Sequence, residues 1–209
     1  LPKKEKRILP LPPSPKEAFR SFSNGAAQLI DLLKTPRDGN AKALFQAPKT
    51  ILNHRVTGAR RFAAQSWSMD RIRAVAKGYH ATVNDIVLGM CGGSLRAYLK
   101  SYDALPALPL VAQVPVSVRA ADADDDNGNA ISAVQVTLGT DIGNAVDRLR
   151  AIQESMKAAK NRLSSMEKAD LNAFTVLSNL PLMLGQATGL AGRRTTMFNV
   201  VISNVPGPK

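Results

Sequence analysis

Hydrophobic residues recur along this chain at two spacings, which predict two kinds of element. Apolar positions three or four residues apart predict amphipathic helices over residues 15–34, 69–79, 83–98 and 146–163. Alternating apolar and polar positions predict strands over 110–118 and 131–138, and residues 60–67 are typical of a shorter strand. The β-branched, apolar run 198–205 predicts a buried strand, which the following Pro-Gly-Pro ends.

The run 198–205 is the most informative stretch because polar groups lie at its end. With a period of two, Asn199 and Ser203 share one face of the strand, and Asn204 lies on the other. Each face therefore carries an amide or a hydroxyl near the strand end. Such a group either hydrogen-bonds the adjoining turn or serves a ligand.

The helix predicted from residue 83 has a recognisable beginning. With Thr82 at the N-cap, Asp85 occupies the third helical position, where its carboxylate reaches the N-cap amide and the positive end of the helix dipole. Asn84 and Asp85 are thus explained by a structural role. Three glycines within residues 89–93 cost about 1 kcal/mol each relative to alanine. Close approach of a neighbouring backbone is a reason for their presence. In the strand 110–118, Pro115 predicts an edge position or a bulge.

Three stretches do not follow either spacing. Residues 1–15 are rich in proline and basic residues and predict an extended linker, and the polar residues 35–58 predict a long excursion between parts of a larger structure. Residues 171–192 carry no charged side chain and favour two short apolar helices broken near Pro181. These helices either belong to the core, line an acyl-binding cavity or lie on a membrane surface.

Composition adds a strong charge and removes several function classes. The 209 residues carry a net charge of +12, which suits an anionic partner such as anionic lipid or the phosphates of a nucleotide. A nucleic-acid-binding module is disfavoured because aromatic residues make up only 5% of the chain and are scattered. The two histidines, His54 and His80, and the single Cys91 form no metal-ligand spacing, and the aspartates at 122–126 lack the pattern of a calcium loop. No metal is expected, and one cysteine fits a reducing compartment.

Four segments together resemble a known enzyme family. They are Phe198-Asn-Val-Val-Ile-Ser-Asn-Val-Pro-Gly-Pro208, Thr82-Val-Asn-Asp85 at a helix start, Arg60-Arg61-Phe62-Ala63, and the strand Val114-Pro-Val-Ser-Val-Arg119. This pattern resembles the bacterial wax ester synthase/acyl-CoA:diacylglycerol acyltransferase family, over most of residues 55–209. The resemblance implies an α/β fold, half of a chloramphenicol acetyltransferase-like, coenzyme A-dependent acyltransferase, with a mixed β-sheet covered by amphipathic helices.

The same resemblance implies an activity. Members of this family are understood to move a long-chain acyl group from acyl-CoA to a fatty alcohol or diacylglycerol, giving wax esters or triacylglycerol. Their general base is the second histidine of a His-His-x-x-x-Asp-Gly motif in the N-terminal half, and imidazole suits that role because it titrates near neutrality. This sequence lacks the motif. We therefore expect the chain to be an internal fragment, inactive alone, whose partner is the N-terminal half of the same enzyme.

The resemblance also assigns domains and site residues. Residues 1–58 are expected to form a linker, a helix and the interdomain crossover, and residues 59–209 the C-terminal acyltransferase-like domain. Ser203 or Asn204 aligns with a channel residue that stabilises the oxyanion, and the Asn84-Asp85 motif is expected to support the channel. On the ground of charge, and not of the resemblance, the candidates for contacts with coenzyme A phosphates or anionic lipid are Arg60, Arg61, Arg193 and Arg194. Acyl-CoA enters as a substrate, with no permanently bound cofactor.

The sequence also leads to an expected location and to one alternative function. We expect a cytoplasmic protein that associates peripherally with membrane or lipid inclusions. A catalytically silent lipid-surface or scaffolding protein of the same fold explains the missing histidines more simply than a separate catalytic half does.

Overall fold

The computed structural model describes residues 14–34, 47–54, 58–117, 131–165 and 197–205. Its helices are α1 (Pro15–Lys34), α2 (Met69–Gly78), α3 (Val83–Ser101) and α4 (Ala145–Ser164), with a short 3-10 turn η1 at Ile51–Asn53. Its strands are β1 (Val111–Ser117), β2 (Ile131–Thr137) and β3 (Val200–Val201). All four predicted helices and the strands at 110–118 and 131–138 are confirmed. The stretches 119–128 and 171–192 lie outside the described residues.

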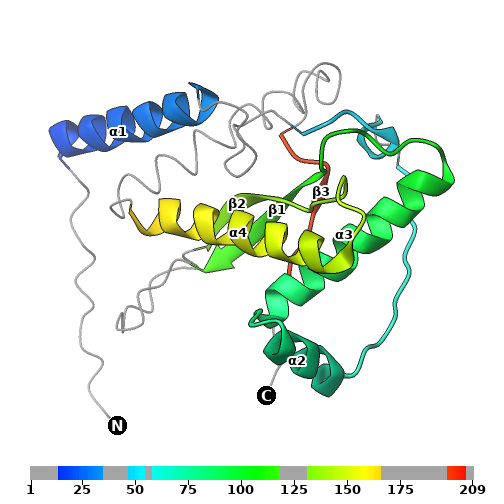
Figure 1. Cartoon of the computed structure of the whole chain (residues 1–209). Helices are drawn as coiled ribbons and strands as arrows, with labels where there is room; N and C mark the ends of the chain where they lie inside the picture. Colours follow the sequence, from blue (N-terminus) through cyan, green and yellow to red (C-terminus); the bar gives the residue numbers. More distant parts are fainter. Residues whose placement is uncertain (1–13, 35–46, 55–57, 118–130, 166–196, 206–209) are drawn as a thin grey trace, which may run out of the picture.

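The three strands form one mixed sheet in the order β2-β1-β3. β1 pairs antiparallel with β2 along its whole length and parallel with β3 over two residues. In Figure 1, α3 and α4 lie in front of this sheet, and α4 runs along β2, with which it makes extensive contact. The sheet is therefore covered by helices on that face, and α1 lies apart from it at the top of the view.

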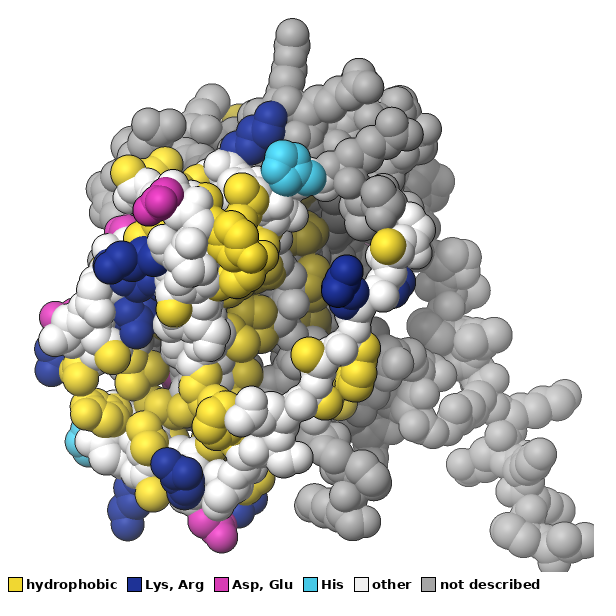
Figure 2. Space-filling view, turned by 90° about the vertical axis from the view of Figure 1, so that its right-hand side faces the viewer, with side chains coloured by type: hydrophobic (Ala, Val, Ile, Leu, Met, Phe, Trp, Pro, Cys, Tyr) yellow, Lys and Arg dark blue, Asp and Glu magenta, His cyan; other side chains and the backbone are white. Residues whose placement is uncertain are grey.

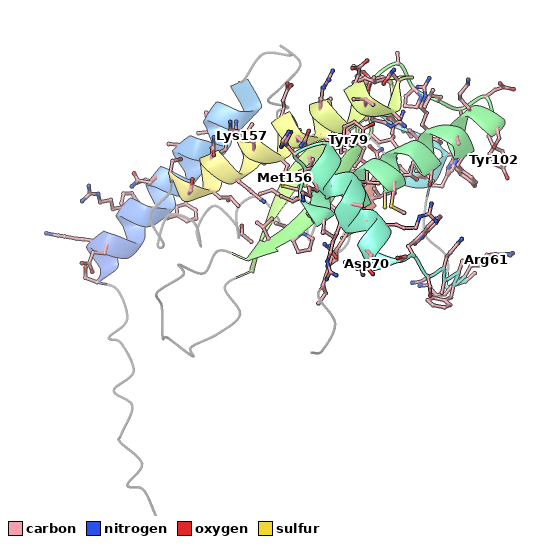
Figure 3. The ribbon with its side chains drawn as sticks, turned by 60° about the horizontal axis from the view of Figure 1, so that its bottom comes forward. Arg61, Asp70, Tyr79, Tyr102, Met156 and Lys157 are labelled. Carbon is pink, nitrogen blue, oxygen red and sulfur yellow. The ribbon has the colours of Figure 1, made fainter. Side chains whose placement is uncertain are left out.

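The core lies between the sheet and the helices α3 and α4. Alternate residues of β2 point into it, and the helices contribute large aliphatic side chains such as Leu88 and Ile152, which are fully buried. On α4, Met156 is buried, whereas its neighbour Lys157 is exposed (Figure 3). This contrast is what an amphipathic helix on a sheet requires, because only one stripe of its surface meets the core.

Pro115 does not place β1 at the edge of the sheet, because β1 is the central strand. The backbone groups of Val111 and Gln113 bond toward the β3 side, where the Val111 carbonyl accepts from Asn199 N and the Gln113 carbonyl accepts from Ile202 N. By the same alternation the nitrogen of Pro115 faces that side, beyond the last of these bonds. Pro115 cannot donate to the Ile202 carbonyl, the next acceptor of the parallel ladder, so the pairing of β1 with β3 ends before it.

Two strand predictions are wrong in part. Residues 60–67 are extended but pair with no strand among the described residues, and every one of them is exposed. Within the run 198–205, only the two residues of β3 form a strand, and Val201 in that strand is 61% exposed. Phe198, Val200 and Ile202 pack against the core, so one face of the run is partly buried as expected. On the other face Asn199 is buried, whereas Val201 and Ser203 are exposed.

Candidate functional site

Asn199 joins three segments at the beginning of β3. Its side chain is only 8% exposed, and its Oδ1 accepts a hydrogen bond from Val111 N at 2.9 Å. Its Nδ2 donates to the Pro48 carbonyl at 2.7 Å and to Asn53 Oδ1 at 2.8 Å. The amide thus uses its donors and its acceptor within the chain. Asn199 holds β3 against β1 and the segment 47–54, and it does not offer a group to a ligand.

The two residues predicted to act on the oxyanion lie a few positions after Asn199, whose hydrogen bonds we call the Asn199 anchor. Ser203 and Asn204 follow Ile202, whose N–H makes the last described backbone bond to β1, at 3.0 Å to the Gln113 carbonyl. Both side chains are exposed, and neither makes a hydrogen bond within the described part of the chain. The hydroxyl and the amide therefore remain available to an external group. The Pro-Gly-Pro turn at 206–208 lies outside the described residues.

The Asn84-Asp85 motif forms the beginning of α3, as its spacing predicts. Asp85 Oδ2 accepts from Thr82 N and from Thr82 Oγ1, each at 2.8 Å, and Asp85 N donates to Thr82 Oγ1 at 3.2 Å. These bonds form a complete capping box, in which Asp85 is buried and Asn84 is half-buried. Their geometry accounts for Asp85 without a ligand. The role as support of a substrate channel stays a prediction.

The arginines proposed for phosphate contacts divide into two groups. Arg60 and Arg61 belong to the exposed, extended segment before α2, and Arg61 lies at the outer margin of the molecule in Figure 3. Arg193 and Arg194 lie outside the described residues. The structure therefore does not bring the four together, and the proposal for each stays a prediction.

The remaining chemical candidates show no catalytic arrangement. His54 and His80 are both exposed and lie in separate segments. Burial raises the pKa of the half-buried Cys91 thiol above its ordinary value, which keeps it protonated and opposes a role as nucleophile. Within the described residues no group of three or more His, Cys, Asp or Glu side chains is placed to hold a metal ion.

A pocket of about 490 Å³ lies where the extended segment meets α2 and α3. Figure 2 faces the side on which residues 58–68 run and shows hydrophobic side chains gathered around a hollow. The pocket is mostly apolar but includes two arginines; its lining consists of Trp67, Ser68, Arg71, Ile72, Val75, Ile86, Gly89, Met90, Gly93, Ser94 and Arg148.

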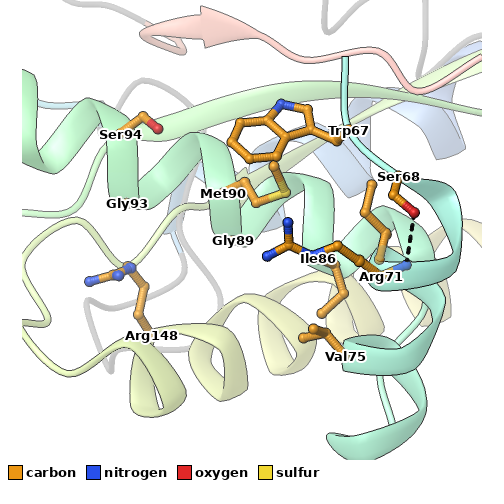
Figure 4. A pocket seen from close by; sticks show the side chains of 11 residues that line it. Trp67, Ser68, Arg71, Val75, Ile86, Gly89, Met90, Gly93, Ser94 and Arg148 are labelled. Atoms are coloured by element: carbon orange, nitrogen blue, oxygen red, sulfur yellow. Dashed lines mark hydrogen bonds between the residues drawn. The ribbon is translucent and has the colours of Figure 1, made fainter. Parts of the chain in front are cut away.

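The arginines enter this pocket from different helices. In Figure 4 the Arg71 guanidinium points from α2 into the pocket beneath Trp67 and Met90, and Arg148 reaches from α4 toward Gly93. Sequence reasoning missed this site because Trp67, Arg71 and Arg148 belong to three different predicted elements. No local spacing relates position 148 to the other two, and only the packing of α3 against α4 brings them to one pocket.

Comparisons with known proteins agree with this architecture. Residues 13–87 match the model of the wax ester synthase/diacylglycerol acyltransferase catalytic domain, and residues 127–209 match that of the WS/DGAT C-terminal domain. A putative diacylglycerol O-acyltransferase of Mycobacterium tuberculosis is 48% identical over 165 residues, which cover 79% of this chain and 37% of the relative. The O-acyltransferase WSD of Acinetobacter baylyi is 42% identical over 165 residues, covering 79% and 35%.

A solved structure extends the match to the fold. The wax ester synthase/diacylglycerol acyltransferase from Marinobacter aquaeolei VT8 superimposes with a TM-score of 0.66 at 38% identity, over 97% of this chain and 41% of that one. The predicted coenzyme A-dependent acyltransferase fold is confirmed. This chain spans little more than a third of the length of the Mycobacterium and Acinetobacter relatives. By its two family matches, its relatives and its fold, the chain belongs to the wax ester synthase/diacylglycerol acyltransferase family.

Proposed function

We propose that this chain is part of an O-acyltransferase that moves a long-chain acyl group from acyl-CoA to a fatty alcohol or diacylglycerol. The observation that carries the proposal is that one chain matches both the catalytic and the C-terminal domain models of a single acyltransferase family. The products are wax esters or triacylglycerol. Acyl-CoA is consumed as a substrate, and no resident cofactor takes part.

The general base of this reaction belongs to a part of the enzyme that the present sequence does not contain. The base must remove the proton of the acceptor hydroxyl as the oxygen attacks the thioester carbonyl. Neither His54 nor His80 has a histidine neighbour in the sequence, and both are exposed. We propose that an N-terminal half carrying the paired histidines supplies the imidazole and completes the site.

Ser203 or Asn204 then donates to the oxyanion that forms on the thioester carbonyl. Two observations support this role: both side chains are exposed, and neither is engaged by a hydrogen bond in the described residues. The Asn199 anchor fixes the backbone a few residues before them. A donor held in place before the reaction stabilises the developing charge with little reorganisation.

The proposed division places the linker, first helix and crossover in residues 1–58 and the C-terminal domain in residues 59–209. The contacts among α2, α3, α4 and the sheet support one packed unit after the crossover. The catalytic-domain match ends at residue 87, inside α3. A continuous helix packed on α4 is not a natural place for a structural boundary, and so we keep the boundary before α2.

Peripheral association with a membrane or a lipid inclusion on the cytoplasmic side completes the proposal. Support comes from α1, which exposes Phe19, Phe22 and Ile30 together with Lys16 and Arg20. Such a helix suits a lipid–water interface, where apolar side chains enter the lipid and basic ones meet anionic headgroups. Among the helices that the structure describes, none has both the length and the apolar character needed to cross a membrane.

A chimera tests the proposed activity. This chain replaces the corresponding region of the Marinobacter enzyme, and wax ester formation is measured with palmitoyl-CoA and hexadecanol. We expect turnover by the chimera and none by the isolated chain, because the latter lacks the paired histidines. The unmodified Marinobacter enzyme is the positive control.

The outcomes separate the proposal from its alternative. A chimera that folds, binds palmitoyl-CoA and gives no product would favour the catalytically silent lipid-surface or scaffolding protein. Turnover by the isolated chain, well above a no-protein blank, would contradict the assignment of the base to another part of the enzyme.

A further inference from the structure

The pocket between the extended segment, α2 and α3 combines two kinds of surface. One side is apolar and is formed mainly by Trp67, Val75, Ile86 and Met90, while the charged groups at the pocket are guanidinium groups. None of the residues that line it is acidic. Its volume of about 490 Å³ falls within the range of small-molecule sites, which is roughly 300–1,000 Å³.

The two arginines differ from their neighbours in their lack of charge partners. Arg73, also on α2, pairs with Asp70 at 3.5 Å, and Arg150 on α4 pairs with Asp147 at 3.2 Å. The Arg71 side chain makes no ion pair or hydrogen bond within the described residues, although it points into the pocket (Figure 4). Arg71 is exposed to solvent, so its guanidinium is available to pair with an anion that lies against the apolar wall.

Arg148 adds a second, buried donor at the same pocket. It is 9% exposed, and its Nη1 donates to the carbonyls of Ile142 at 2.8 Å and Gly143 at 3.4 Å. Its buried Nε has no acceptor among the described residues. Two backbone carbonyls do not neutralise a cation, so Arg148 keeps its positive charge at the pocket wall.

We propose that this pocket binds a single-chain lipid anion, with its carboxylate or phosphate head at Arg71 and its alkyl chain against Trp67 and Val75. The apolar wall selects an alkyl chain. The unpaired Arg71 selects an anionic head over a neutral one, and the positive charge of Arg148 elsewhere on the pocket wall adds to this preference. A long-chain carboxylate and an alkyl phosphate share this chemistry. The binding does not depend on the proposed acyl transfer, because it needs no base and no reacting group.

Trp67 provides a direct measurement because it is the only tryptophan in the chain and lines the pocket. The purified chain is titrated with laurate, with dodecyl phosphate and with dodecanol while its intrinsic fluorescence is recorded. We expect a saturable blue shift with one or both anions, because the alkyl chain removes water from a ring that is 55% exposed. The ratio of the two dissociation constants identifies the preferred head.

Substitutions on α2 separate the pocket from general attraction to a basic protein. Arg71→Gln is expected to weaken anion binding about tenfold, the loss of one charge-assisted hydrogen bond at a partly exposed site. Arg71→Lys is expected to lose less, because it keeps the charge but not the planar fork. Arg73→Gln removes the same charge from the same helix outside the pocket, and it should leave the dissociation constant unchanged.

Circular dichroism of each variant establishes that it is folded. The proposal is overturned if dodecanol binds as tightly as laurate and dodecyl phosphate, if no ligand changes the Trp67 emission, or if Arg71→Gln and Arg73→Gln have equal effects. Each of these results leaves the acyl-transfer proposal untouched, since turnover is measured separately on the chimera.

Discussion

Asn199 is expected to be the side chain on which the position of β3 depends most. Replacing it with alanine removes the bonds to Val111, Pro48 and Asn53 and leaves buried groups unsatisfied. We expect Asn199→Ala to lower the free energy of unfolding by about 2–4 kcal/mol. Urea denaturation measures the change. Asn204→Ala is the matched control and should stay within about 0.5 kcal/mol of the parent, because that side chain is exposed. Equal losses of stability in both variants would contradict the role of Asn199 in holding β3 against β1.

Substitutions of Ser203 and Asn204 test the catalytic role of these side chains separately from any effect on stability. Since neither side chain is bonded in the described residues, Ser203→Ala and Asn204→Ala should each leave the melting temperature nearly unchanged. In the active chimera, the variant that removes the oxyanion donor should lower kcat by about 10²–10³ with little change in KM. The second variant is the internal control. Unchanged kcat in both would remove these residues from the mechanism.

The anchor residue was not predictable in its role, although the sequence drew attention to its strand. The alternating pattern places Asn199 and Ser203 on one face and marks both as polar groups near a strand end. It does not tell which of them is buried, because the partners of Asn199 at positions 48, 53 and 111 lie in segments distant along the chain. The capping box of Thr82 and Asp85 was predictable because all of its bonds are local.

The glycines of α3 are not equivalent, and the difference is testable. A Cβ on Gly92 would stand 2.6 Å from the Leu138 carbonyl oxygen, which is backbone and has little freedom to move. A Cβ on Gly89 would meet only Leu149 Cδ1, at an ordinary 3.5 Å. We expect Gly92→Ala to destabilise the fold by about 2 kcal/mol or more. Gly89→Ala should stabilise it by up to about 1 kcal/mol, because alanine favours helix.

Thermal or urea unfolding of both variants measures this difference within one helix. Two variants of equal stability would show that α3 does not approach the residue after β2 as closely as the structure places it. The spacing of the glycines predicts only that some backbone comes near. Which glycine meets it follows from the crossing of α3 over the residues after β2 and has no local signal.

The extended segment before α2 shows that a local sequence pattern does not predict strand pairing. Residues 60–67 have the composition of a strand, and their backbone is extended, but no described strand pairs with them. Phe62 is 93% exposed there. Residue propensity favours an extended backbone, whereas strand pairing also requires an unpaired edge on another strand. β1 and β2 pair with each other along their whole length. From the sequence, only the alternation of buried and exposed positions in these strands was predictable, and their register was not.

The net charge of the whole chain sets a background of anion binding. Twenty-eight basic residues against sixteen acidic ones give a net charge of +12, and any such protein attracts anions to some extent. A specific phosphate contact at Arg60 and Arg61 must therefore exceed this background. Both belong to the exposed segment that precedes the pocket, and Arg60 also donates to the Ala59 carbonyl at 2.9 Å.

We expect binding of palmitoyl-CoA to the chimera to weaken as sodium chloride rises from about 50 to about 300 mM, because added salt screens contacts between exposed charges. The double variant Arg60→Gln, Arg61→Gln should bind more weakly and with a shallower dependence on salt. Arg150→Gln combined with Lys157→Gln removes the same net charge from α4, far along the sequence from this segment, and is the matched control. If the two double variants lose affinity equally, the attraction belongs to net charge alone. If affinity is independent of salt, phosphate recognition by exposed arginines is excluded, and the acyl chain must carry the binding.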